Sequence, residues 1–279
     1  AHYNMYDLNV VSLGAGVQSM ALILLAEKGE VERPDCAIFA DTGWEPDAVY
    51  DQLNWLKEET TIPIHVVTAG NLKEDVLKVL GPEGQKISRI GQPPFFVRND
   101  EGDGTDLGGM LWRKCTTDYK INPIQKKIRT LLGYKPRQRV KKKARQGFGI
   151  SVDEAHRMRD SRVSWIDNYY PLVDLEMRRA DCLSWMKEQG YPEPRKSACI
   201  GCPYHSNSTW AKMRRDYPDE FDDAVAFDAE LRKGKLPGVI GNAYLHRSML
   251  PLAEAVDSTH DPDQIEMDFG QECEGMCGV

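Results

Sequence analysis

The sequence predicts an α/β fold, a doubly wound parallel sheet with helices on both faces, because two periodicities alternate near its start. Short apolar runs at 8–12, 36–40 and 64–68 have the length of strands, and helical patterns follow at 17–28, from Pro46 and from Asn71. Strands that alternate with helices form a parallel sheet covered on both sides. Ligands bind beyond the carboxyl ends of such strands, so we expect a site at the loops 12–19 and 41–45.

Local signals indicate where these elements begin and end. Gly29 follows the first helical pattern, where a left-handed residue ends a helix. Pro46 suits a first helical turn, and Asn71 can cap a helix with its side chain. Further elements are expected: a helix at 122–132, a strand at 148–152, an extended segment at 164–172, a helix at 178–189 and two helices flanking Pro218. We divide the chain into an α/β domain at 1–175 and a cysteine-bearing helical region at 176–279.

Two segments have unusual compositions. Residues 81–111 are rich in glycine and proline and lack periodicity, so we expect a mobile loop that acts as a lid. Residues 113–145 are strongly basic, although the whole chain has a formal net charge of −7. This asymmetry predicts an anionic partner for the basic segment, with a solvated loop as the alternative.

The overall composition points to a protein without membrane spans. Hydrophobic residues make up 41% of the chain and charged residues 28%, and no apolar run is long enough to cross a bilayer. No signal peptide pattern is visible, and the seven cysteines are an odd number. We therefore expect a cytoplasmic protein whose clustered thiols are metal ligands, redox groups or sulfur carriers.

The loop "SLGAGVQS" at 12–19 separates the first strand from the first helix. Glycine lets backbone N–H groups converge on an anion, and the helix N-terminus adds donors and a positive dipole end. Ser12 and Ser19 add hydroxyl groups. The loop lacks the Gly-Lys-Ser/Thr of a Walker A motif and the third glycine of a dinucleotide fingerprint. It predicts a phosphate-binding turn, and a plain tight connection is the alternative.

Five stretches resemble, in order, motifs of the PP-loop or adenine nucleotide alpha-hydrolase superfamily, in particular its phosphoadenylyl-sulfate (PAPS) reductase-like branch. The first loop resembles the PP-loop, usually S-G-G-x-D-S. The others resemble that branch's segment after the second strand, its Cys-x-x-x-x-Lys-x-x-Pro segment, its Gly-Ile-Arg-x-Asp-Glu turn and its late Cys-x-x-Cys: "FADTGWEP", "RKCTTDYKINPI", "GISVDEAHR" and "SACIGCP". The resemblance spans residues 12–203 and implies a HUP-type sheet that binds ATP or a related adenylyl nucleotide with Mg²⁺.

The resemblance also implies a nucleotide site. Its expected members are Ser12, Gly14, Ala15, Gly16, Gln18, Ser19, Asp41, Thr42, Gly43 and Arg157. Because the loop lacks the aspartate of S-G-G-x-D-S, we expect Asp41 to be the catalytic residue that holds Mg²⁺. Ser151 stands where the turn motif has arginine, so Arg157, or alternatively Arg162, is expected to replace that contact.

The cysteines suggest a metal centre. Cys199 and Cys202 lie in one tight turn, which suits zinc or an iron–sulfur cluster, although a redox pair has the same spacing. The resemblance implies that Cys115 joins them. We assign the fourth ligand to Cys182, with Cys273 as the competitor. The resemblance favours a [4Fe–4S] cluster, and Zn²⁺ is the alternative.

Three further residues receive an interpretation. Cys36 is expected to be an apolar core residue, because it lies in a predicted buried strand. His205 is expected at the surface, with a role as a spare ligand as the alternative. The tail "ECEGMCGV" resembles the Glu-Cys-Gly segment of sulfonucleotide reductases, whose cysteine attacks sulfur. This likeness implies a catalytic role for Cys273, and an idle, disordered tail is the alternative.

These observations predict an enzyme. The leading hypothesis is an ATP pyrophosphatase, a PP-loop sulfurtransferase, that adenylates an acceptor for sulfur transfer, as in thiolation or phosphorothioation of a nucleic acid. The basic segment 113–145 would bind tRNA or DNA, and a donor protein would supply sulfur. One alternative is an APS or PAPS reductase that uses Cys273. The other is a non-catalytic, nucleotide-gated subunit that binds nucleic acid.

Overall fold

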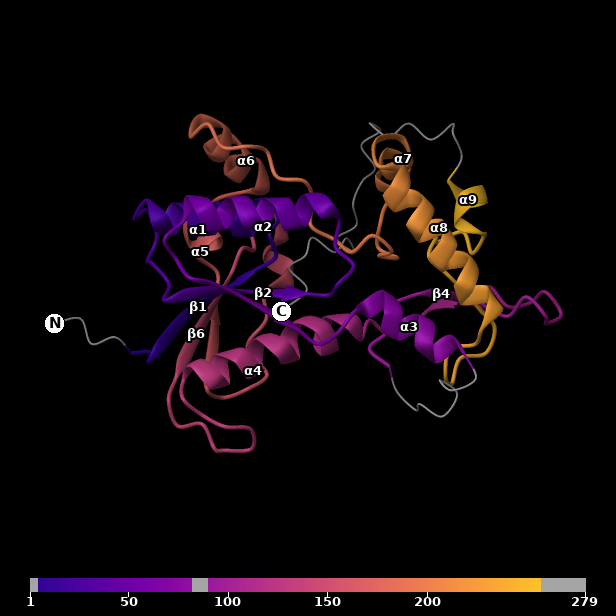
Figure 1. Ribbon diagram of the computed structural model, residues 1–279, viewed down its shortest axis with the longest axis horizontal. Coiled ribbons are helices and arrows are strands. Elements are labelled where there is room, and N and C mark those ends of the chain that lie inside the picture. Colours follow the sequence, from indigo (N-terminus) through magenta and orange to yellow (C-terminus); the bar gives the residue numbers. More distant parts are fainter. Residues whose placement is uncertain (1–4, 82–89, 257–279) are drawn as a thin grey trace.

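A five-stranded parallel sheet forms the middle layer of one half of the computed structural model, which describes residues 5–81 and 90–256 (Figure 1, left). Its strands are β1 (Leu8–Leu13), β2 (Cys36–Asp41), β3 (Ile64–Thr68), β6 (Ala144–Phe148) and β7 (Ile166–Tyr169). Their order is β3-β2-β1-β6-β7, and all neighbours run parallel. The predicted α/β class is confirmed. The winding of the chain reverses between β1 and β6, and ligands of such sheets bind at this reversal.

Helices cover both faces of the sheet, as expected for a doubly wound fold. One face carries α1 (Val17–Glu27), α2 (Asp47–Glu59), α5 (Pro171–Asp174) and α6 (Arg179–Glu188), and the other carries α4 (Asn122–Leu131) (Figure 1). A π-helical turn, Thr117–Ile121, leads into α4. No helix among the described residues is both long and apolar enough to cross a membrane.

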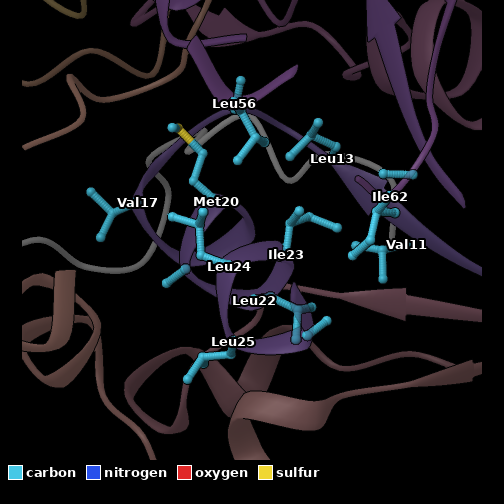
Figure 2. Close-up of a cluster of buried hydrophobic side chains, with 14 of the residues drawn as sticks. Val11, Leu13, Val17, Met20, Leu22, Ile23, Leu24, Leu25, Leu56 and Ile62 are labelled. Atoms are coloured by element: carbon cyan, nitrogen blue, oxygen red, sulfur yellow. The ribbon is translucent and has the colours of Figure 1, made fainter. Parts of the chain in front are cut away.

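Helix α1 is buried on all sides because α6 packs over it while the sheet lies beneath. Figure 2 shows Met20 and Ile23 of this helix among Leu13 of β1 and Leu56 of α2. Burying one such side chain contributes about 1.5–3 kcal/mol. The apolar run after the first loop therefore fixes the helix, and with it the start of the candidate site.

The predicted helix boundaries at Gly29 and Asn71 are confirmed. Gly29 has a φ of +77° just after α1, and Asn71 Oδ1 accepts a hydrogen bond from the backbone N–H of Glu74 at 3.0 Å, at the start of α3 (Leu72–Leu80). The predicted strand at 148–152 is wrong. The strand ends at Phe148 because Gly149 lies against the start of α1, and residues 152–157 form a 3₁₀ helix.

A second hydrophobic core combines distant parts of the chain. Its elements are α3, β4 (Phe96–Arg98), α7 (Asn207–Asp216), α8 (Pro218–Lys233), β8 (Asn242–Tyr244) and α9 (Leu252–Ala255), and the exposed strand β5 (Gly109–Met110) lies at its margin. The three strands form an antiparallel sheet in the order β5-β4-β8. The predicted boundary at residue 175 does not separate this core from the first, since α3 and β4 precede it and α8 follows it.

The segment 81–111 is only partly a loop. Residues 82–89 lie outside the described part of the chain, as do Cys273 and Cys277. Residues 90–111 contain β4 and β5, and Phe95 is fully buried against Phe227 of α8. Antiparallel pairing of β4 with β8 holds residues 96–98 in the small sheet, whereas residues 99–107, between β4 and β5, form a largely exposed loop, for which the lid stays a prediction.

Candidate functional site

The first loop of the site joins β1 to α1 at the carboxyl edge of the sheet. The Gly14 N–H donates to Ser19 Oγ at 3.2 Å, and Ala15 adopts a left-handed φ of +57°. Gly16 is the N-cap and makes no side-chain cap. The first N–H groups of α1 and the positive end of its dipole thus lie at this edge, which suits an anion.

The segment after β6 packs directly on this loop. A Cβ on Gly149 would lie 2.6 Å from the backbone N of Ser19, so only glycine fits there. Gln18 Nε2 donates to Glu154 Oε2 at 3.2 Å, and Arg157 forms an ion pair with the same carboxylate at 2.5 Å. The structure therefore brings the predicted residues Gln18, Ser19 and Arg157 together.

The second loop follows β2, whose last residue is Asp41. Its Oδ1 accepts hydrogen bonds from the Gly43 N–H and the Tyr50 hydroxyl, both at 2.7 Å. Burial, and then the bond to Asp41, raise the pKa of Tyr50, so its hydroxyl stays a donor. Gly43 has a φ of +74° and lies against Asn71. The carboxylate is thus fixed at the strand end, next to the first loop.

Thr42 and Glu45 connect this second loop to the cysteine turn. Thr42 is buried, and its Oγ1 lies 3.3 Å from Cys199 Sγ and donates to Glu45 Oε1 at 3.3 Å. Glu45 is also buried, and its Oε1 lies 3.9 Å from Lys120 Nζ. Three predicted motifs, far apart in the sequence, therefore meet at one point.

The cysteine turn and the residues just before it are hydrogen-bonded to both loops. The Ile200 N–H donates to the Trp44 carbonyl at 3.0 Å, and Gly201 packs on the indole of Trp44. Ser197, just before the turn, donates from its hydroxyl to the carbonyl oxygen of Gly14. Trp44 is itself held by a bond from its indole N–H to Asp223 at 2.8 Å. The thiols thus lie beside the expected nucleotide loops.

Cys115, Cys199 and Cys202 line one small cavity, with a volume of about 30 Å³. Burial raises the pKa of all three thiols, that of Cys202 to about 12, so they are neutral near pH 7 in the protein without metal. Lys120 lines the same cavity. Burial opposes its charge, but Glu45 and the cysteines raise its pKa overall, so the site retains a cation.

Cys182 is not brought to this cavity. It is fully buried in the first core, where α6 packs on α1, and the charged groups that influence it include Asp153 and Asp181. The structure therefore gives no support to its assignment as the fourth ligand. The competitor, Cys273, lies outside the described residues. Within residues 5–81 and 90–256, no three His, Cys, Asp or Glu side chains are placed so that they could hold one metal ion.

His205 is buried, so the prediction of a surface histidine is wrong. Its Nε2 lies 2.9 Å and 3.2 Å from the carbonyl oxygens of Cys199 and Ile200, so this nitrogen donates. Burial lowers its pKa to about 4, and the ring is neutral near pH 7. His205 thus stabilises the cysteine turn through hydrogen bonds to its backbone. Cys36 is buried in β2, as predicted, and burial raises its pKa to about 11.

The basic segment 113–145 is divided between the two edges of the sheet. Arg113 and Lys120 lie at the cysteine cavity, where the Arg113 guanidinium is 5.6 Å from the centre of the Tyr204 ring. The exposed cations of 133–143 precede β6, and the Lys143 N–H donates to Asp7 at 2.8 Å, just before β1. Only the start of the segment therefore reaches the candidate site.

Sequence reasoning missed three residues of the site. Glu45 could have been found, because it is an acid that closely follows a strand at the expected edge. Gln52 and Ser197 gave no signal. Gln52 Nε2 donates to the carbonyl of Ala15 at 2.7 Å, and its Oε1 accepts from the Arg195 N–H at 2.7 Å. Such partners are distant in the chain and emerge only from the fold.

Comparisons with known proteins give little further information. No family model matches the chain, and no curated protein matches it. Among solved structures, the chain is similar to the phosphoadenylyl-sulfate (PAPS) reductase of Candida auris, solved as a phosphate complex. The sequence identity is 15%, the match covers 68% of this chain and 76% of that chain, and the TM-score is 0.42.

Proposed function

We propose that the protein is a PP-loop, PAPS reductase-like enzyme that uses ATP to adenylate an acceptor for sulfur transfer. One observation carries the proposal: the Cys199–Cys202 turn is bonded to both strand-end loops, through Ser197 to Gly14 and through Cys199 to Thr42. If the first loop holds the triphosphate, these thiols lie beside the reacting nucleotide. Thiols so placed suit sulfur chemistry coupled to nucleotide cleavage.

The reaction would take place in two displacements. An acceptor oxygen would attack the α-phosphorus of ATP, the bond to the β-phosphate would break, and pyrophosphate would leave. A sulfur nucleophile at the sulfide level, brought by a donor, would then attack the adenylated centre, and AMP would leave with the acceptor oxygen. Asp41 would hold Mg²⁺, and the N–H groups at the start of α1 would stabilise the phosphate charge.

As placed, Cys115, Cys199 and Cys202 do not form the ligand set of one metal ion, so these side chains would have to reorient to hold the proposed metal centre, a [4Fe–4S] cluster or, alternatively, Zn²⁺. Their donor chemistry suits both, since each is bound by cysteine thiolates. Glu45 Oε2 is buried without a hydrogen-bond partner, and Lys120 adds a cation beside the thiols. These unusual buried charges fit a site built around a charged group. When bound, a cluster would supply iron that binds or orients sulfur.

The test uses the full chain, purified anaerobically. We expect iron and acid-labile sulfide in the wild type, and their loss in Cys199→Ser and Cys202→Ser. Cys36→Ser and Cys182→Ser are matched controls and should retain both. Pyrophosphate release from ATP should require tRNA or DNA, and the release of AMP should in addition require sulfide. The proposal fails if no nucleic acid elicits pyrophosphate, and total loss of activity in Cys273→Ser with a sulfonucleotide as substrate would favour a reductase instead.

A further inference from the structure

A second cavity lies directly behind the cysteine turn, between α6 and α7. Its volume is about 520 Å³, compared with about 30 Å³ for the cysteine cavity. Ala198 and His205 line the second cavity, while Cys199 and Cys202 line the first. The segment that carries the cysteine turn therefore lines both cavities. In Figure 1 the orange segment that leads from α6 to α7 carries this turn.

The second cavity is basic. Four of its lining residues are cationic and one, Glu193, is acidic; the cations are Arg179, Arg195, Lys196 and Lys212. Arg195 is held in place, because its guanidinium makes a bidentate pair with Glu220 at 2.9 and 2.6 Å and lies 3.5 Å from the centre of the Tyr217 ring. The pair with Glu220 neutralises Arg195, so the cations suited to a phosphate in this concave site are Arg179, Lys196 and Lys212.

The positive charge of this cavity also reaches the cysteine turn. Lys196 and Ala198 line this cavity and lie just before Cys199, which lines the cysteine cavity. An anion bound in the second cavity would therefore lie within electrostatic range of the thiols.

The exposed basic loop 133–143 has no such proximity. It precedes β6, whose first residue, Ala144, pairs with Leu8 at the start of β1. The candidate site lies at the other end of these strands. A strand of five or six residues spans roughly 16–20 Å at about 3.3 Å per residue. A ligand held only by this loop would be a strand length away from the thiols.

We infer that the cavity between α6 and α7 binds the phosphate groups of the nucleic-acid acceptor, and that the loop 133–143 does not. This inference rests on the proposed function and names the surface that its acceptor uses. Cations on both helices and on the intervening segment would grip the backbone. The neighbouring nucleotide would then extend past the cysteine turn to the adenylation site.

The test is binding of a fluorescent single-stranded DNA, and of the same sequence as RNA, each about 20 nucleotides long so that it exceeds a typical site. The cavity variant combines Arg179→Gln, Lys196→Gln and Lys212→Gln. The matched control combines Lys135→Gln, Arg139→Gln and Lys141→Gln and removes the same charge from the loop 133–143. Anisotropy is measured over a series of salt concentrations, and circular dichroism checks that both variants fold.

Each lost phosphate contact should reduce the salt slope by about 0.7, so the cavity variant should lose about 2 in slope and about 100-fold in affinity at 0.1 M salt. The control should stay within about 2-fold of the wild type. Lys212→Gln alone changes an exposed side chain and should lower the affinity about 5-fold. This single variant tests the inference even if the triple variant does not fold.

Equal losses in the two triple variants, or no binding of either strand by the wild type, would overturn the inference. Preference for RNA or for DNA would support it and identify the acceptor. Calorimetry of the wild type with ATP alone separates this result from the proposed function. If ATP binds and neither strand does, the acceptor surface is wrong while the nucleotide site stands.

Discussion

The turn that carries Cys199 and Cys202 depends on a glycine at its centre. A Cβ on Gly201 would lie 2.0, 2.6 and 2.7 Å from three atoms of the Trp44 ring. The ring cannot retreat, because it is 3% exposed, packs 4.5 Å from the centre of Phe227 and is hydrogen-bonded to Asp223. Gly201→Ala should therefore lower the free energy of unfolding by about 1–3 kcal/mol, as overpacking does in a core.

Urea unfolding of the full chain measures this loss. Gly109→Ala is the matched control, because a Cβ there meets nothing within 4 Å and the backbone is not left-handed, so its stability should change little. Trp44→Phe removes the outer ring atoms that would clash. The double variant Trp44→Phe/Gly201→Ala should lose less free energy of unfolding than the two single variants lose in sum. The difference should be about 0.5–3 kcal/mol. The packing argument would be refuted if Gly201→Ala unfolded at the same urea concentration as the wild type. It would also be refuted if the losses of the two single variants simply added in the double variant.

Three further results are expected. Gly149→Ala should destabilise the fold by about 1–3 kcal/mol and weaken ATP binding in calorimetry, because its Cβ would meet the Ser19 backbone at 2.6 Å. The Thr60 hydroxyl helps to lower the pKa of Glu27 to about 2. Glu27 therefore stabilises the fold above its unfolded pKa of 4.5, and this stabilisation is lost as the pH falls toward 2. In urea unfolding measured over this pH range, Glu27→Gln should make the free energy of unfolding depend less on pH. Iodoacetamide at about pH 8 should leave Cys202 unmodified in the folded, metal-free protein and modify it in urea, as read by mass spectrometry.

The parallel sheet and its first loops could be predicted because their signals are local. The strand at 64–68 has the predicted bounds, and the side chain of Asn71 caps α3 as expected. The loop 12–19 was placed at the sheet edge from the order of strand, glycines and apolar helix alone. Such features depend on a few adjacent residues, so they survive in any arrangement of the rest of the chain.

Other features depend on contacts between distant segments. The prediction of a strand at 148–152 is wrong because Gly149 lies against the start of α1, a contact that no local pattern indicates. Cys182 has the same residue type as the other predicted ligands, but the packing of α6 on α1 places it in a different core. Residues 96–98 lie in a segment that looks like a loop, yet their pairing with β8 makes them a strand of the small sheet. The choice of Cys182, based on its place near the start of the predicted helix 178–189, could not account for this packing.

The buried pair Glu45 and Lys120 needs a reason other than stability. Its atoms lie 3.9 Å apart, with side chains only 2% and 10% exposed, and such pairs often stabilise no more than apolar residues would. Lys120→Met alone should cost about 3–5 kcal/mol in urea unfolding, because it leaves a buried carboxylate without its cation. The double variant Glu45→Gln/Lys120→Met should return close to the wild-type stability, yet lose iron, because the thiolates lose the cation beside them. If the double variant is as unstable as the single one, the pair supports the fold, and its place among three thiols gives no indication of their chemistry.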